Sequence, residues 1–142
     1  MAKSTLTPAQ KKSQEFAVEA ARLMEDRKCE DVRVLDVRGL SQVCDYLIVG
    51  SGTSDRQMRS IAHEMKALGR EHDNEVFRTN ADEEHTWIVV DFVEVVIHLF
   101  EPNQRGYYDL ETLWSDAKEV SWKRNGTTKK ASAKKTSKKK KE

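Results

Sequence analysis

Apolar residues recur along this chain with two different periods, and each period predicts one kind of element. The first apolar stripe has the three-to-four-residue spacing of an amphipathic helix, with Thr7 placed to cap it and Pro8 at its first position. Its members are Phe16, Ala20, Leu23 and Met24. A second stripe follows Thr53 and Ser54, either of which can cap a helix, and consists of Met58, Ile61, Ala62, Met65 and Leu68. We therefore expect two long helices, the first ending near Lys28.

Shorter segments have the composition of strands. They are residues 32–37, 46–49, 75–79 (the weakest), 87–91 and 95–100. Tyr46–Val49 is apolar throughout, as expected of a strand that is covered on both faces. Only Phe92-Val93-Glu94 separates the last two segments, which predicts a hairpin. Residues 80–86 are polar and acidic and predict a loop, whereas residues 107–117 predict one or two short helical turns.

The order of these elements predicts one α/β domain over residues 8–122, with a mixed sheet of about five strands flanked by helices. Residues 123–142 are rich in Lys, Ser, Thr and Ala and show no apolar periodicity. Such a segment cannot bury enough apolar surface to offset the entropy of ordering it. We therefore expect a disordered, lysine-rich C-terminal tail.

The formal net charge of +1 hides a strong segregation of charge. Residues 123–142 hold nine Lys and one Arg against one Glu, a net charge of +9. Residues 1–122 hold fifteen basic and twenty-three acidic residues, a net charge of −8. An acidic body suits a basic protein partner and a basic tail suits phosphate, so ribosomal or other RNA is a candidate contact for the tail. The alternative is that both regions simply aid solubility.

Several function classes find no support in the sequence. The chain has neither a secretory signal nor a stretch near the ~18 apolar residues that a membrane helix needs, so we expect a cytoplasmic protein without membrane contact. In that compartment Cys29 and Cys44 are expected to be reduced, with Cys44 a small core residue. The cysteines and the four histidines show no metal-ligand spacing, so we expect no metal and no cofactor.

The turn at residues 50–54, Gly-Ser-Gly-Thr-Ser, is the one candidate for nucleotide chemistry. Backbone N–H groups at such a turn before a helix can hold a phosphate, but glycines are also needed simply to turn a strand into a capped helix. Nucleotidyltransferases place a glycine-serine turn here and add two carboxylates at i and i+2 on a strand for Mg²⁺. After the turn, Asp91 and Glu94 are three residues apart, and Asp82-Glu83-Glu84 lies in a predicted loop. No such pair therefore stands on a convincing strand, and we expect no enzyme activity.

The hairpin carries the candidate binding residues. Alternation places Trp87, Val89 and Asp91 on one face of its first strand. In the second strand it groups Val96, His98 and Phe100. A sheet face with Trp, His and Phe is an interaction patch if it is uncovered. In the alternative, the short C-terminal helical turns cover it with Tyr107, Leu110, Leu113 and Trp114.

Several separated motifs, in order over about residues 13–118, resemble the ribosomal silencing factor (Iojap) family. They are LDVRGL at 35–40, CDYLIVGSGTSDRQ at 44–57, WIVVD at 87–91, VVIHLF at 95–100 and YYDLETLW at 107–114. The resemblance implies a mixed sheet related to nucleotidyltransferases without their catalytic carboxylates. It also implies a non-enzymatic factor that binds the large ribosomal subunit through the ribosomal protein numbered fourteen and sterically blocks subunit association, repressing translation.

By this resemblance the partner-binding residues lie around Trp87. They are Trp87, Val89, Asp91, His98, Phe100 and Tyr107. We expect a monomer on the ribosome, with a homodimer as an alternative when free. The rival functions are a nucleotidyltransferase-like enzyme and a general RNA-binding module led by the tail. The chain departs from the family at Asn80-Ala81, where Glu-Gly is usual, and at Val93-Glu94, where Gly-Asp is usual. A missing Gly changes the turn type that fits, so these departures bear on the geometry of the two loops more than on the partner.

Overall fold

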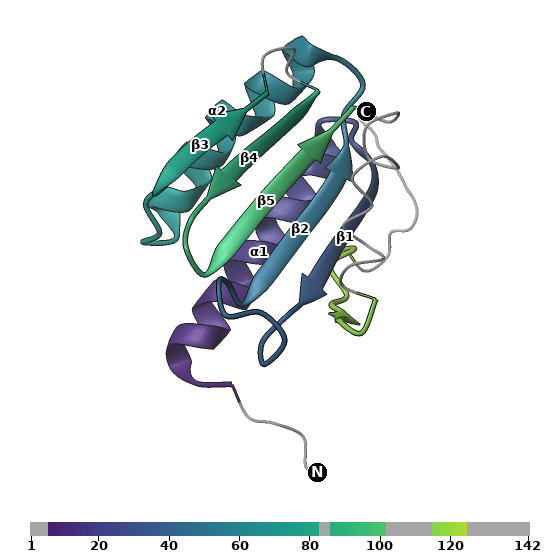
Figure 1. The fold of residues 1–142 in the computed structure, drawn as a ribbon. Coiled ribbons are helices and arrows are strands. Elements are labelled where there is room, and N and C mark those ends of the chain that lie inside the picture. The colour runs from purple at the N-terminus through teal and green to yellow at the C-terminus, as the bar shows by residue number, and fades with distance from the viewer. Residues whose placement is uncertain (1–5, 83–85, 102–114, 125–142) are drawn as a thin grey trace.

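The computed structural model describes residues 6–82, 86–101 and 115–124. Within these residues it contains two helices, α1 (Pro8–Asp26) and α2 (Asp55–Glu71). The strands are β1 (Glu30–Asp36), β2 (Tyr46–Ser51), β3 (Arg78–Ala81), β4 (Trp87–Asp91), β5 (Val95–Phe100) and β6 (Lys118–Glu119). They form one sheet in the order β3-β4-β5-β2-β1-β6 (Figure 1). The central pair β2 and β5 is parallel and every other pair is antiparallel, which confirms the prediction of a mixed sheet.

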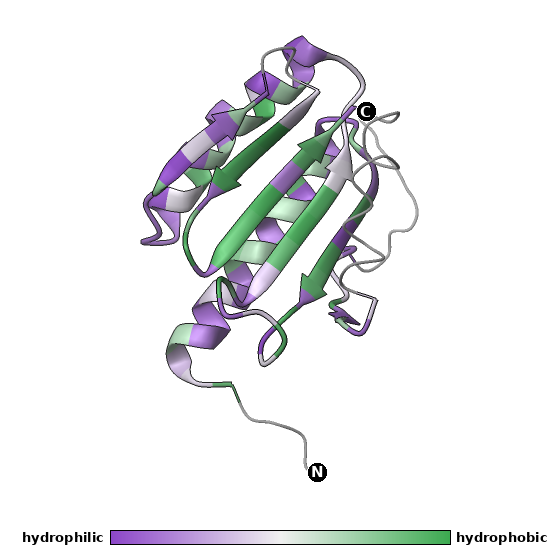
Figure 2. Ribbon diagram, in the orientation of Figure 1, coloured by the Kyte–Doolittle hydropathy of each residue, from purple (hydrophilic) through white to green (hydrophobic). Residues whose placement is uncertain are grey.

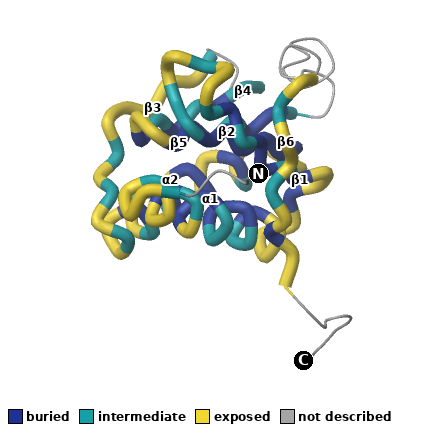
Figure 3. Tube along the Cα trace, turned by 90° about the horizontal axis from the view of Figure 1, so that it is seen from below, coloured by how far each residue is buried: buried dark blue, intermediate teal, exposed yellow. Residues whose placement is uncertain are grey.

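Both helices lie on the same face of the sheet, so the molecule has two layers (Figures 1 and 3). The main core fills the space between the layers. Its helix residues include Phe16, Ala20 and Met24 from α1 and Met58, Ile61 and Met65 from α2. The predicted caps are confirmed, since the Thr7 side chain accepts a hydrogen bond from the backbone of Gln10 and the Ser54 side chain accepts one from Gln57.

A second apolar cluster lies on the face of the sheet that the helices do not cover. Its buried members are Leu35, Val37, Leu47, Val49, Val96 and Phe100. Cys44 packs against this cluster, as predicted for a small core residue. Every residue of β2 is buried, as its unbroken apolar composition predicts. The hydrophobic strands therefore lie in the middle of the sheet, and the hydrophilic strand β3 lies at its edge (Figure 2).

The structure corrects several predicted boundaries. Asn80 and Ala81 belong to β3 rather than to a loop, because they pair with Val89 and Ile88 of β4. β2 continues through Ser51, two residues beyond its predicted end. The sheet also gains the short strand β6, which pairs with Leu35 and Asp36 of β1 and has no counterpart in the prediction.

Some predictions fall outside the part of the chain that the structure describes. The helical turns expected at residues 107–117 lie almost wholly there, and so does residue 107 of the candidate binding set, Tyr107. The tail is described only as far as Arg124, whose guanidinium binds the carboxylate of Asp26 at 2.8 and 2.9 Å. Among the described residues, neither helix is both long and apolar enough to span a bilayer.

Candidate functional site

Three aromatic rings gather on the face of the sheet opposite the helices, where β4 and β5 pair. The register sets Trp87 beside Phe100 and Val89 beside His98. The indole of Trp87 stacks on His98, with ring centroids 5.8 Å apart, and on Phe100, with centroids 5.3 Å apart. His98 and Phe100 stack at 6.0 Å with an interplanar angle of 12°. We call these three residues the ring cluster.

A hydrogen bond fixes the ring cluster in one arrangement. The indole Nε1–H of Trp87 donates to Nδ1 of His98 at 3.0 Å, so this nitrogen must be unprotonated. Burial lowers the pKa of His98 to about 4, while the charge of Asp91 acts in the opposite direction. The imidazole is therefore neutral at physiological pH and accepts the bond from Trp87.

Asp82 anchors the start of β4 and with it the position of Trp87. Its Oδ1 accepts hydrogen bonds from the backbone N–H groups of Thr86 at 2.7 Å and Trp87 at 3.0 Å. The Thr86 hydroxyl donates to Oδ2 of the same carboxylate. These bonds, with the one from the Thr86 side chain the strongest, lower the pKa of Asp82 and keep it charged.

Asp91, at the other end of β4, also accepts a hydrogen bond from the backbone of the neighbouring turn. Its Oδ1 accepts a hydrogen bond from the backbone N–H of Val93 at 2.8 Å, and its Oδ2 lies 3.5 Å from Nε of Arg78 on β3. Val93 has a φ of 77° in this turn, in the left-handed region that β-branched residues rarely enter. The turn therefore retains a backbone conformation suited to Gly, although the sequence has Val there.

A hollow of about 390 Å³ opens beside the exposed edge of Trp87. It is lined by Asn80, Ala81, Asp82, Trp87 and Val89. An aromatic wall with a carboxylate at its rim is the kind of site that receives a basic or amphipathic side chain of a partner protein.

The structure brings most of the predicted residues together. Trp87, Val89, Asp91, His98 and Phe100 share one face of the β4–β5 hairpin, as alternation predicts. Phe100 is fully buried and packs against the other two rings. That these residues contact a partner stays a prediction.

Three residues beside the ring cluster were missed from the sequence. They are Arg78, Asn80 and Asp82. Arg78 and Asn80 reach this face through β3, which begins at Arg78 and continues two residues past its predicted end. The only sequence signal was the short polar segment before Trp87, where an Asp suits the start of a strand or turn.

The glycine turn that suggested nucleotide binding has its backbone groups occupied. The N–H of Gly52 donates to the carbonyl of Phe100 at 2.8 Å, and the N–H of Thr53 donates to the side chain of Gln57 at 2.7 Å. A Cβ on Gly52 would lie 2.3 Å from a side-chain carbon of Met58. Close packing therefore explains the glycine, and the turn has no free N–H at these two positions for a phosphate.

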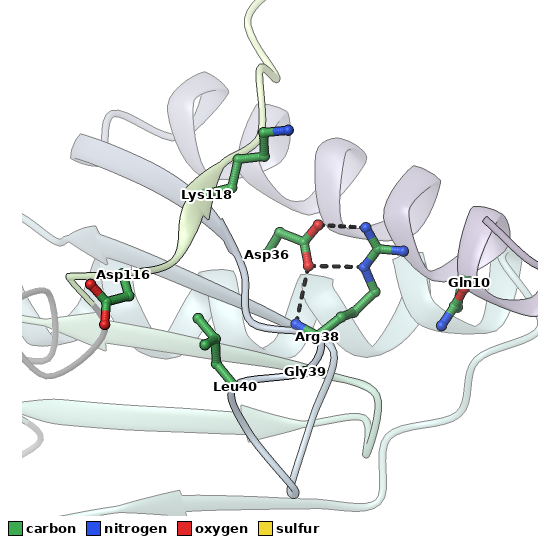
Figure 4. Close-up of a pocket in the computed structure, with 7 residues that line it drawn as sticks. All are labelled: Gln10, Asp36, Arg38, Gly39, Leu40, Asp116 and Lys118. Atoms are coloured by element: carbon green, nitrogen blue, oxygen red, sulfur yellow. Dashed lines mark hydrogen bonds and ion pairs between the residues drawn. The ribbon is translucent and has the colours of Figure 1, made fainter. Parts of the chain in front are cut away.

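A second recess, of about 500 Å³, lies where β1 and β6 meet near the start of α1 (Figure 4). Arg38 and Asp36 form a bidentate ion pair there, with N···O distances of 2.9 and 2.7 Å. Lys118 and Asp116 also line the recess, so its charges cancel. The positive charge of Arg38 is used within the fold, where it helps to hold the turn after β1.

The remaining candidates for chemistry are weak nucleophiles. Burial raises the pKa of the Cys29 thiol to about 12 and that of Cys44 to about 11, so both are thiols at neutral pH. Within residues 6–82, 86–101 and 115–124, the structure shows no group of three or more His, Cys, Asp or Glu side chains placed to hold a metal ion.

The partly buried, neutral His98 predicts a specific pH dependence of stability. The pKa of His98 is lower in the folded chain than its ordinary value of about 6.5, so between these values the unfolded chain binds more protons. Stability should therefore fall as pH is lowered from about 6.5 to about 4, by up to about 1.4 kcal/mol per pH unit from this residue.

Urea unfolding at a series of pH values can isolate this contribution. In His98→Gln, a side-chain oxygen can still accept the bond from Trp87, but the titrating group is gone. The difference in unfolding free energy between wild type and variant should slope with pH across this window and be flat above it. Parallel curves for the two proteins would show that His98 is not held neutral by the fold.

A family described as ribosomal silencing factor during starvation matches residues 10–142. A Bacillus subtilis relative named ribosomal silencing factor RsfS is 40% identical over 98 residues, covering 69% of this chain and 83% of that protein. A Mus musculus relative named mitochondrial assembly of ribosomal large subunit protein 1 is 29% identical over 96 residues, covering 66% of this chain and 42% of that protein.

Solved structures agree with the sequence relatives. A crystal structure of a Chromobacterium violaceum protein matches with a TM-score of 0.67 and 30% identity, covering 81% of this chain and 95% of that one. The sheet with both helices on one face thus places this chain in a structural class of small α/β proteins known from bacteria. More narrowly, the chain belongs to the ribosomal silencing factor family, a family of regulatory proteins, which confirms the resemblance seen in its motifs.

Proposed function

We propose that this protein binds the large ribosomal subunit through the ribosomal protein numbered fourteen and sterically blocks association with the small subunit, repressing translation. Membership of the ribosomal silencing factor family supports a ribosomal role. The name of the Mus musculus relative refers to the ribosomal large subunit, which supports that subunit as the target.

The observation that carries the proposal is the ring cluster with the hollow beside it. Trp87 is half-buried, so one part of the indole is held by His98 and Phe100 while another part borders the hollow. An aromatic side chain held in this way binds at little cost in conformational entropy. The carboxylate of Asp82 lines the hollow, and Asp91 lies on the same sheet face at the other end of β4. Residues 1–122 carry a net charge of −8, which favours a basic ribosomal protein as the partner.

A steric blocker needs no catalytic group, and the described residues favour that mechanism over turnover. Two N–H groups of the glycine turn, those of Gly52 and Thr53, already have partners at Phe100 and Gln57. A nucleotidyltransferase-like enzyme is therefore the weaker candidate, and radiolabel transfer with Mg²⁺ and nucleotides tests it directly. We propose that the protein acts in the cytoplasm and as a monomer when bound to the ribosome.

Cosedimentation through sucrose with separately purified large and small subunits tests the proposal. The protein should pellet with the large subunit and remain in the supernatant with the small one. Adding it to large subunits before the small ones should reduce the fraction of joined ribosomes, whereas adding it to joined ribosomes should have less effect. Equal pelleting with both subunits, or binding that leaves joining unchanged, would contradict the proposal.

A further inference from the structure

A row of basic side chains follows the solvent side of α2, on the layer of the molecule opposite the ring cluster. Counted from the first, its members stand at i, i+3, i+7, i+10 and i+14. They are Arg56, Arg59, His63, Lys66 and Arg70. Because each helical residue advances by about 100°, this spacing keeps all five within about 80° of the helix circumference. We call these five residues the basic row.

The packing of α2 shows which way the basic row faces. The opposite side of the helix, including Met58 and Met65, is buried against the sheet. The flank next to α1 is marked by Gln57 and Glu64, which bind the backbone carbonyl of Arg27 at 2.6 Å and its guanidinium at 2.7 Å. The basic row therefore occupies the remaining flank, away from α1, where the outer turns of α2 are exposed (Figure 3).

Most of this positive charge is not used within the fold. Arg59 binds Asp55 at 3.1 Å. Within the part of the chain that the structure describes, Arg56, Lys66 and Arg70 take part in no ion pair. Like charges four residues apart destabilise a helix, and Lys66 and Arg70 are such a pair. A helix that served solubility alone would mix the two signs along this flank, particularly in a body with a net charge of −8.

We propose that the basic row binds the phosphate backbone of duplex RNA. From its first to its last member the row covers fourteen residue steps, or about 21 Å, with about one basic side chain per helical turn. A rigid, regularly spaced line of charge matches the regular phosphates of a duplex better than it matches the irregular acidic groups of a protein surface. Arg guanidinium groups also bind phosphate oxygens in pairs.

This contact would recognise RNA by shape and charge, without reading its sequence. The A-form major groove is too deep and narrow for side chains to read, so a helix lying along the backbone contacts phosphates and ribose. The ring cluster lies on the other layer (Figure 3), so an RNA contact along α2 does not compete with the protein contact proposed above. The same small protein could then hold a protein and an RNA helix of one ribonucleoprotein at the same time. The inference does not depend on which ribosomal protein is bound.

Fluorescence anisotropy with a labelled 20-base-pair RNA duplex of arbitrary sequence tests the proposal on the full chain. The test variant carries Arg56→Gln, Lys66→Gln and Arg70→Gln, which keep good helix propensity and leave the Arg59–Asp55 pair intact. The matched control carries Lys11→Gln, Lys12→Gln and Lys28→Asn, which remove the same charge from exposed positions elsewhere. A third variant, Arg56→Lys with Arg70→Lys, retains the charge.

Neutralising three phosphate contacts should reduce the slope of log affinity against log salt by about 2–3 units and weaken binding at 0.1 M salt at least about tenfold. The matched control and the Lys variant should bind nearly as wild type does, and all variants should melt at similar temperatures. Equal losses in the test and control variants, or no loss in either, would overturn the proposal. Stronger competition by poly-glutamate than by unlabelled duplex would overturn it in favour of an acidic protein partner.

Discussion

Replacing Trp87 with alanine should weaken binding to the large ribosomal subunit by about 2–4 kcal/mol, roughly 30-fold or more in affinity. The indole is held by stacking on His98 and Phe100 and by its hydrogen bond to His98, so it is already ordered before a partner arrives. Its truncation removes both the aromatic wall of the hollow and the group that holds His98. Cosedimentation or surface plasmon resonance with purified large subunits measures the change.

The same substitution will cost some stability, because Trp87 packs against the second apolar cluster. Trp87→Phe separates the two effects, since it retains a stacking ring and removes only the indole N–H and part of the contact area. Phe16→Leu is the matched core control. Phe16 lies on α1, is fully buried in the main core and packs edge-on against Phe92, with ring centroids 4.7 Å apart. This control substitution should lower the melting temperature and leave binding by the folded protein unchanged.

The outcome decides between a surface anchor and a core residue. Loss of a buried large aromatic costs about 3–5 kcal/mol of folding stability. If Trp87→Ala lowers the melting temperature by an amount typical of such a loss, and its folded fraction binds the subunit normally, Trp87 belongs to the core and the interface lies elsewhere.

The ring cluster could be predicted from the sequence because it depends only on alternation within two adjacent strands. The hairpin link of three residues fixes the antiparallel pairing, and the apolar segments fix which residues face the same way. Trp87, His98 and Phe100 then share a face whatever the rest of the fold does. Their hydrogen bond and the neutral state of His98 could not be predicted, because both depend on side-chain burial in three dimensions.

The long elements followed from the same reasoning. α1 and α2 each bury one face, so their apolar residues repeat with the helical period, and their caps are local features. β2 is buried on both sides, so its apolar residues are continuous. In each case the side of the element that is buried determines the pattern of apolar residues in the sequence.

The two edge strands of the sheet, β3 and β6, have no apolar pattern in the sequence that predicts them. All four residues of β3 are exposed, so its position is decided by backbone pairing with β4 and not by apolar side chains. β6 has two residues and is too short for any period to show. Arg78 and Asn80 join the candidate binding surface through β3, which is why the sequence identified the ring cluster but not its rim.

The lysine-rich tail is the second feature from which a large effect is expected. The structure describes Lys123 and Arg124, and the Arg124–Asp26 ion pair ties this point of the chain to the end of α1. Residues 125–142 hold eight Lys and one Glu, a net charge of +7. The composition of this segment predicts a flexible chain, and a flexible chain of 18 residues has a root-mean-square reach of about 5–6 Å × √18, or roughly 23 Å. That reach is sufficient to contact RNA beside a docked body.

Deleting residues 125–142 should leave selectivity for the large subunit unchanged and reduce affinity at low salt. Each phosphate contact that is lost should make the slope of log affinity against log salt shallower by about 0.7–0.9 unit, so several lost contacts lower the affinity by orders of magnitude at 50 mM salt. Truncation after Arg124 keeps the ion pair with Asp26, so a change in fold stability does not confound the measurement.

Two matched variants make the test specific. A tail of the same length with its eight Lys changed to Gln should behave like the deletion, whereas a tail of the same composition in shuffled order should behave like wild type, because counterion release depends on charge and not on order. An unchanged salt slope after deletion would show that the tail only aids solubility. Loss of all preference for the large subunit would show that recognition resides in the tail, which would favour an RNA-binding module over a silencing factor whose folded body selects its target.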